Sequence, residues 1–128
     1  MDLGAGIDRF LDSLRLERGL SKNTITAYAN DLGQLLRFCE EYDAAAVKEL
    51  RLFEERHVLA FAVALGKRQL AVRSQARMLV AVRSLARYLR AENLVERDFA
   101  AEVSLPRIGR PLPKALSEQE VEALLALR

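Results

Sequence analysis

Apolar side chains recur at helical spacing along most of the chain. Over residues 3–18 they occupy positions i, i+3, i+4 and i+7, which places them on one face of an α-helix. Three more stretches share this period: one that opens at Ser21 and closes near Tyr42, one over 54–65, and one over 71–91. β-branched residues never form an alternating run, so no strand is expected. The pattern predicts an all-α fold, a bundle of four main helices plus short helices.

Each stripe defines residues that should face the core. They are Ile7, Phe10, Leu11 and Leu14, then Ile25, Tyr28, Leu32, Leu35, Leu36 and Cys39, then Val58, Phe61, Ala62 and Leu65, and finally Met78, Val82, Leu85, Ala86 and Leu89. Ser21 is a suitable N-cap for the second helix, and Gly19 and Gly66 are expected to end the first and third helices. Residues 47–52 are compatible with either a turn or a short helix.

The period is lost toward the C-terminus. Residues 106–116 contain all three prolines of the chain and read as an extended linker. Ser117 and Glu120 then form a capping box at the start of another apolar stripe. We therefore expect a helical domain over 1–105, a linker over 106–116, and a helix over 117–128 that would open a further domain.

Composition offers little for catalysis. The single cysteine, Cys39, excludes an internal disulfide and a cysteine zinc site, and it suits a reducing, cytoplasmic setting. The single histidine, His57, has no partner for metal binding, so we expect either a surface position or a satisfied structural role for it. We find no phosphate-binding glycine loop, signal peptide or membrane-spanning stretch. No catalytic residue, metal, cofactor, small-molecule substrate or membrane contact is therefore expected.

Charge is distributed unevenly, although the net charge is only +2. From Lys67 to Arg90 every charged residue is basic: Lys67, Arg68, Arg73, Arg77, Arg83, Arg87 and Arg90. A solvated helix face normally mixes both signs, so this segment favours an anionic partner. Arg73 and Arg77 are one turn apart, opposite the core stripe of the last helix, where they could enter a DNA major groove.

A second contact zone is predicted at the start of the second helix. Helix N-terminal amides favour phosphate, and Lys22, Thr24 and Thr26 could add to such a site. The alternative is that Ser21 only caps the helix and Lys22 is solvated.

Several short segments, in this order, resemble the core-binding (SAM-like) domain of tyrosine site-specific recombinases, above all the bacterial Xer type. They are Phe10-Leu11, 17–24, Tyr28, Asp31-Leu32, 76–83, Tyr88-Leu89, 106–107 and 112–117. Each segment is short, but together they cover nearly the whole chain.

The resemblance implies a domain that clamps DNA, with its second and fourth main helices across the major groove. Its DNA-binding residues would be Lys22, Asn23, Thr24, Thr26, Arg68, Arg73, Ser74, Gln75, Arg77, Arg107, Arg110 and Lys114. Its partners would be double-stranded DNA and other recombinase protomers, which form a tetramer on DNA in this family. The family's catalytic residues would follow residue 128, so no enzymatic activity is expected of this chain. Chromosome dimer resolution and integration of a mobile element both remain open.

Two other functions are compatible with the residues alone. The basic helix could dock an acidic protein, which would make the chain a protein-interaction module. An enzyme with an unrecognised site is the other alternative, and the missing catalytic constellation argues against it.

Overall fold

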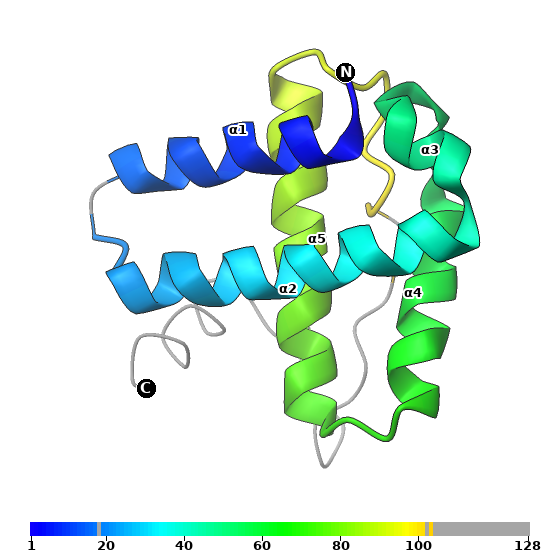
Figure 1. Ribbon diagram of the computed structural model, residues 1–128. Helices are drawn as coiled ribbons and strands as arrows, with labels where there is room; N and C mark the ends of the chain where they lie inside the picture. Colours follow the sequence, from blue (N-terminus) through cyan, green and yellow to red (C-terminus); the bar gives the residue numbers. More distant parts are fainter. Residues whose placement is uncertain (18, 102, 104–128) are drawn as a thin grey trace.

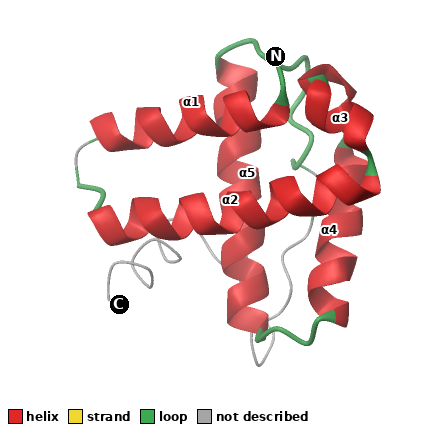
Figure 2. Ribbon diagram, in the orientation of Figure 1, coloured by secondary structure: helices red, strands yellow, loops and turns green. Residues whose placement is uncertain are grey.

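The computed structural model describes residues 1–17, 19–101 and 103 of the chain. Its regular elements there are all helical (Figure 2). They are α1 (Leu3–Leu16), α2 (Lys22–Tyr42), α3 (Ala44–Lys48), the 3-10 helix η1 (Leu50–Leu52), α4 (Glu55–Lys67) and α5 (Val72–Ala91). The predicted all-α bundle is confirmed. The segment 47–52, which the pattern left open, is shared between α3 and η1.

The helices are arranged around α5. Helices α1 and α2 run antiparallel, side by side, and α5 crosses both of them (Figure 1). Helix α4 lies beside α5, and α3 and η1 close one end of the bundle. Helix α5 contacts α1, α2 and α4, and it has more buried residues than any other helix in the described part of the chain. No helix in the described part of the chain is both long and apolar enough to cross a membrane.

The core forms where the predicted stripes meet. All the predicted core residues are buried except Ile25, Leu36 and Ala62, which are half-buried at its edge. Phe10 of α1 meets Tyr28 of α2 edge-on, with ring centroids 6.0 Å apart. Cys39 is buried as predicted, and this burial, with a smaller effect of the Asp43 charge, raises its thiol pKa to about 12.

The N-terminal cap of α2 agrees with the sequence prediction. Ser21 has extended backbone angles, and its hydroxyl accepts a hydrogen bond from the Thr24 amide at 3.0 Å. This bond satisfies one of the amides that the first helical turn leaves without a partner.

Both predictions that a glycine caps a helix end are wrong. Helix α1 ends at Leu16 with Glu17 as its cap, and Gly19 lies beyond it in the turn with φ 85°. Helix α4 continues through Gly66, and Gln69 takes the left-handed conformation instead, with φ 57°. A glycine adopts the left-handed conformation at little cost in free energy. Which residue adopts it nevertheless depends on where packing ends the helix.

Candidate nucleic-acid interface

The first turn of α2 presents some of the predicted contact residues and buries another. Lys22, Asn23 and Thr26 are exposed. Thr24 is only 1% exposed, and its hydroxyl lies 2.9 Å from that of Ser21. A direct contact between Thr24 and DNA is therefore not supported by its position, whereas Lys22 and Thr26 flank the exposed helix start.

The turn between α4 and α5 brings a second group of predicted residues next to α2. Arg68 donates a hydrogen bond to Gln34 of α2 at 3.1 Å, which ties this turn to α2. Gln75 donates to the backbone carbonyl of Leu70 at 2.8 Å, so its amide stabilises the turn itself. Arg73, on the first turn of α5, is exposed.

A buried ion pair joins α2 to α5. Arg77 donates from Nε and from one terminal nitrogen to the two carboxylate oxygens of Asp31, at 3.0 and 2.9 Å. The Arg77 side chain is 13% exposed and that of Asp31 is 0% exposed. The guanidinium of Arg77 is therefore held inside the molecule, and its position does not support the prediction that it touches DNA directly.

The outer face of α5 is less open than the sequence pattern indicated. Val80 is buried on this side, and the Ser84 hydroxyl is buried with no hydrogen-bond partner in the described part of the chain. Arg73 and Arg87 are exposed, whereas the Arg77 side chain is only 13% exposed. Of the two arginines predicted to enter a major groove, only Arg73 is therefore exposed, because α5 is packed on several sides.

The predicted site residues in the described part of the chain lie in two groups, one on the first turns of α2 and one on the α4–α5 turn and the first turns of α5. Exposed among them are Lys22, Asn23, Thr26, Arg68 and Arg73, half-buried are Ser74, Gln75 and Arg77, and Thr24 is buried. Arg107, Arg110 and Lys114 lie outside the described residues.

Sequence reasoning missed further polar residues on α2. Asn30 and Arg37 are exposed, and Gln34 holds Arg68. Asn30, Gln34 and Arg37 are spaced by four and three residues, so they share one flank of the helix. They continue a helical spacing that begins at the predicted contact residue Asn23, and this spacing is the sequence signal that could have identified them.

The segments that contain most of α2 and nearly all of α5 share a near absence of acidic residues. Between Lys22 and Arg37 the only acidic residue is Asp31, and between Lys67 and Arg90 there is none. Since the carboxylate of Asp31 is buried against a guanidinium, neither segment exposes a negative charge. We call these two segments, 22–37 and 67–90, the basic corner of the molecule. Asp31 follows Tyr28 by three residues, and this place within an apolar stripe is the sequence signal of its burial.

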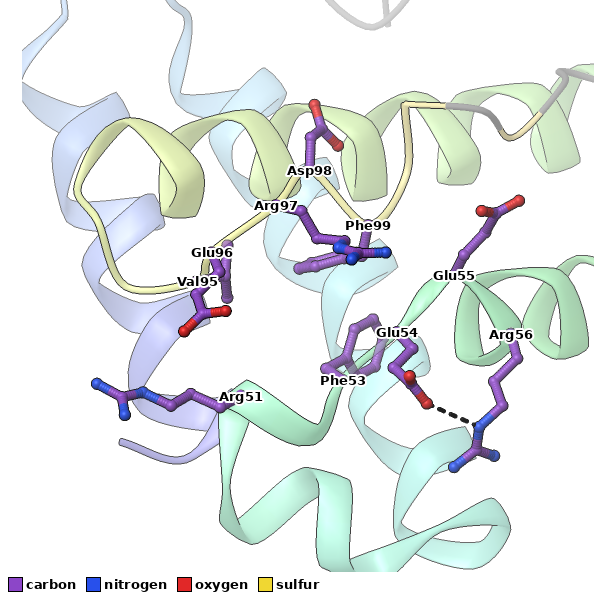
Figure 3. Close-up of a pocket in the computed structure, with 10 residues that line it drawn as sticks. All are labelled: Arg51, Phe53, Glu54, Glu55, Arg56, Val95, Glu96, Arg97, Asp98 and Phe99. Atoms are coloured by element: carbon purple, nitrogen blue, oxygen red, sulfur yellow. Dashed lines mark hydrogen bonds and ion pairs between the residues drawn. The ribbon is translucent and has the colours of Figure 1, made fainter.

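A hollow away from the basic corner is lined by charges of both signs. It measures about 480 Å³ and lies between η1, the start of α4 and residues 95–99 (Figure 3). Acidic and basic side chains both line it, and Glu54 and Arg56 pair there at 3.1 Å. The Phe53 and Phe99 rings meet edge-on, with centroids 4.6 Å apart. With charges of both signs, this hollow offers no field that would attract a polyanion.

Of the two roles expected for His57, the structure shows the satisfied structural one. The ring is fully buried, its Nδ1 accepts from the Glu54 amide at 2.9 Å, and its Nε2 lies 2.8 Å from Asp43 Oδ2. Both nitrogens are therefore satisfied within the fold. No group of three metal-ligating side chains occurs among the residues that the structure describes.

Comparison with known proteins identifies the family. Residues 7–93 match the model of the phage integrase N-terminal SAM-like domain. The chain is 42% identical over 119 residues to tyrosine recombinase XerD of Pseudomonas putida, covering 93% of this chain and 39% of that protein. It is 39% identical over 123 residues to XerD of Mycobacterium leprae, covering 91% and 38%.

A third relative, tyrosine recombinase XerC of Roseiflexus castenholzii, is 36% identical over 121 residues, with 94% of this chain and 38% of that protein covered. The chain thus spans about two fifths of the length of these curated relatives. No solved structure matches it. From the family match over 7–93 and the all-helical fold, the chain belongs to the phage integrase N-terminal SAM-like domain family.

Proposed function

We propose that this chain binds double-stranded DNA through its basic corner and acts as the DNA-positioning domain of a tyrosine recombinase. The observation that carries the proposal is the absence of any exposed carboxylate over segments 22–37 and 67–90, while basic residues on both remain exposed. DNA affinity depends largely on neutralising phosphates, and two segments whose exposed charges are all basic provide that attraction.

The exposed residues of the basic corner differ in their proposed roles. Lys22 and Thr26, with the amides at the start of α2, would contact phosphate oxygens. Arg73 would approach the groove or the backbone from α5, since an α-helix fits the major groove and arginine binds guanine edges and phosphate. Asn23, Arg68 and Ser74 would complete this surface, and Thr24 and Gln75 would support it from within. Arg107, Arg110 and Lys114 would follow the DNA backbone, as the family resemblance implies.

The whole protein is proposed to be a tyrosine recombinase, as its relatives are named. Such an enzyme cuts and rejoins DNA through a phosphotyrosine link, and its protomers act as a tetramer on two sites. In that reaction this chain would position the DNA and would itself cut no strand. Either chromosome dimer resolution or integration of a mobile element would use such a domain.

Duplex binding across a salt series tests the proposal. Fluorescence anisotropy should show an affinity that falls steeply as salt rises. Arg73→Ala and Lys22→Ala should each weaken binding and lower the salt slope by about one unit if the residue contacts phosphate. Lys48→Ala is the matched control, because Lys48 is also exposed but lies on α3 at the far end of α2.

Two outcomes would overturn the proposal. The first is a folded chain that fails to bind duplex at low salt, and the second is an equal loss in the Lys48 control. Binding to polyglutamate as tight as binding to DNA would instead support an acidic protein as partner.

A further inference from the structure

The Asp31–Arg77 ion pair is not explained by stability alone. Burying two charges costs hydration free energy, and well-packed apolar residues in their place are often equally stabilising. What the pair does provide is a fixed relative orientation of the two side chains. A guanidinium that donates two parallel bonds to one carboxylate holds both side chains in a single geometry. Here that geometry spans the crossing of α2 and α5.

The pair lies between the two halves of the basic corner. Arg73 precedes Arg77 by one helical turn on α5, and Gln34, which binds Arg68, follows Asp31 by three residues on α2. A slip of α5 along its axis by one residue would displace Arg73 by about 1.5 Å relative to α2. Phosphates are spaced regularly along a duplex, so contacts from two helices require a fixed relation between them.

We propose that Arg77 is a positioning residue for DNA binding: held by Asp31, it fixes α5 against α2 so that both helices engage one duplex together. This inference rests on the proposed function. Arg77 then affects DNA binding without touching DNA, and Asp31 is as important for this effect as Arg77. The two arrangements make opposite predictions for the removal of the acid.

Asp31→Asn is the deciding variant. Positioning predicts that duplex binding by the folded chain weakens about tenfold, comparable to the loss of one good contact, with the salt slope unchanged. If Arg77 instead contacts DNA and Asp31 merely restrains it, loss of the acid will free the guanidinium and tighten binding. A lower unfolding midpoint with unaltered affinity of the folded chain would assign the pair a purely structural role and overturn the inference.

A double variant that replaces both charged residues keeps the test valid if the single variant fails to fold. In Asp31→Leu/Arg77→Met, packed apolar side chains take the place of the ion pair. Positioning predicts that binding weakens about tenfold with an unchanged salt slope, because apolar side chains cover the crossing without fixing its geometry. Binding within about threefold of wild type would overturn the inference. Arg77→Met alone should lose about tenfold, because it leaves the buried carboxylate unpaired. A tenfold loss and a slope lower by about one unit in the double variant would show a direct phosphate contact instead.

A measurement without DNA separates the inference from the proposed function. Spin labels at Lys22→Cys and Arg73→Cys report the distance between the two halves of the basic corner, and buried Cys39 should stay unlabelled. The distance distribution should be narrow in wild type and broader with Asp31→Asn. If Asp31→Asn broadens the distribution while the unlabelled wild-type chain fails to bind duplex, DNA binding is refuted and the fixed crossing is upheld. An unchanged distribution would overturn the positioning role even if wild type binds DNA.

Discussion

Asp43 is the residue on which three elements converge. It caps the end of α2 at the start of α3, and its carboxylate lies 2.8 Å from His57 Nε2 and 3.0 Å from an Arg56 nitrogen. Because His57 Nδ1 accepts from the Glu54 amide, the ring proton lies on Nε2 and faces Asp43. Phe53 stacks on the same ring with centroids 4.8 Å apart. These contacts hold the start of α4 against the end of α2.

This arrangement predicts a loss of stability in acid. The hydrogen bond from His57, and after it that from Arg56, holds the Asp43 pKa below its usual 3.8. A folded-state pKa below the unfolded value means that unfolding takes up a proton, so the stabilisation is present above pH 3.8 and is lost as pH falls below it. Urea unfolding at stepped pH should therefore show a smaller acid-dependent fall for Asp43→Asn than for wild type.

Asp8→Asn provides the comparison, because Asp8 is exposed on α1 and makes none of these contacts. Its acid dependence should match that of wild type. If Asp43→Asn and wild type lose stability equally below pH 3.8, the carboxylate of Asp43 does not stabilise the fold.

At the scale of elements, helix starts are defined by local chemistry. Ser21 caps α2 with its own hydroxyl, and Asp2 caps α1 by accepting from the Ala5 amide at 2.6 Å. Helix ends are not defined by the nearest glycine, since α4 continues through Gly66 and α1 ends before Gly19. A cap at the start needs only a side chain and the amides of the next turn, whereas the end of a helix depends on what the last turn packs against.

Removal of the α2 cap should destabilise the domain measurably. Ser21→Ala leaves the Thr24 amide without its acceptor, and we expect a loss of about 1 kcal/mol in the free energy of unfolding. Ser13→Ala is the matched control, because the Ser13 hydroxyl only bonds the Phe10 carbonyl within α1. Denaturant unfolding that shows equal losses for both serines would contradict a capping role for Ser21.

At the scale of the whole molecule, α5 contributes more buried residues to the core than any other described helix. It contacts α1, α2 and α4, and Leu85 in its middle is fully buried. A single core of this kind should unfold in one cooperative step. Damage at its centre should therefore lower the stability of every helix together.

Leu85→Ala tests that dependence. Loss of the side chain leaves a cavity among packed helices, and we expect the free energy of unfolding to fall by about 2–5 kcal/mol. Leu59→Ala, in α4, removes a leucine that is 45% exposed and should change it by less than about 0.5 kcal/mol. Circular dichroism and near-ultraviolet probes should follow the same transition in both variants. Separate transitions for α4 and α5 would contradict a single core.

Much of the site could be predicted from the sequence at the level of segments and less at the level of side chains. The sequence predicts the basic run that leads into α5 and the contact zone at the start of α2. The structure ties the turn before α5 to the middle of α2 through the Arg68–Gln34 hydrogen bond. Thr24 and Arg77 were predicted to face DNA, yet one is buried and the other is paired with Asp31. Thr24 lies on the flank of its apolar stripe, where helical period alone does not separate a buried position from an exposed one. Arg77 lies opposite its stripe, and only the packing of α2 against α5 places it beside Asp31.

The sequence by itself determined which residues form helices, which face of each helix is apolar, and where α2 begins. These properties depend on side chains within a few residues of one another, so a local pattern contains them. Only the tertiary structure decided that α5 would be enclosed by α1, α2 and α4, and that Arg77 would meet Asp31 across forty-six residues of chain. The reason is physical. A helical pattern predicts that an apolar face is buried, but the relative placement of the helices decides which residues bury it.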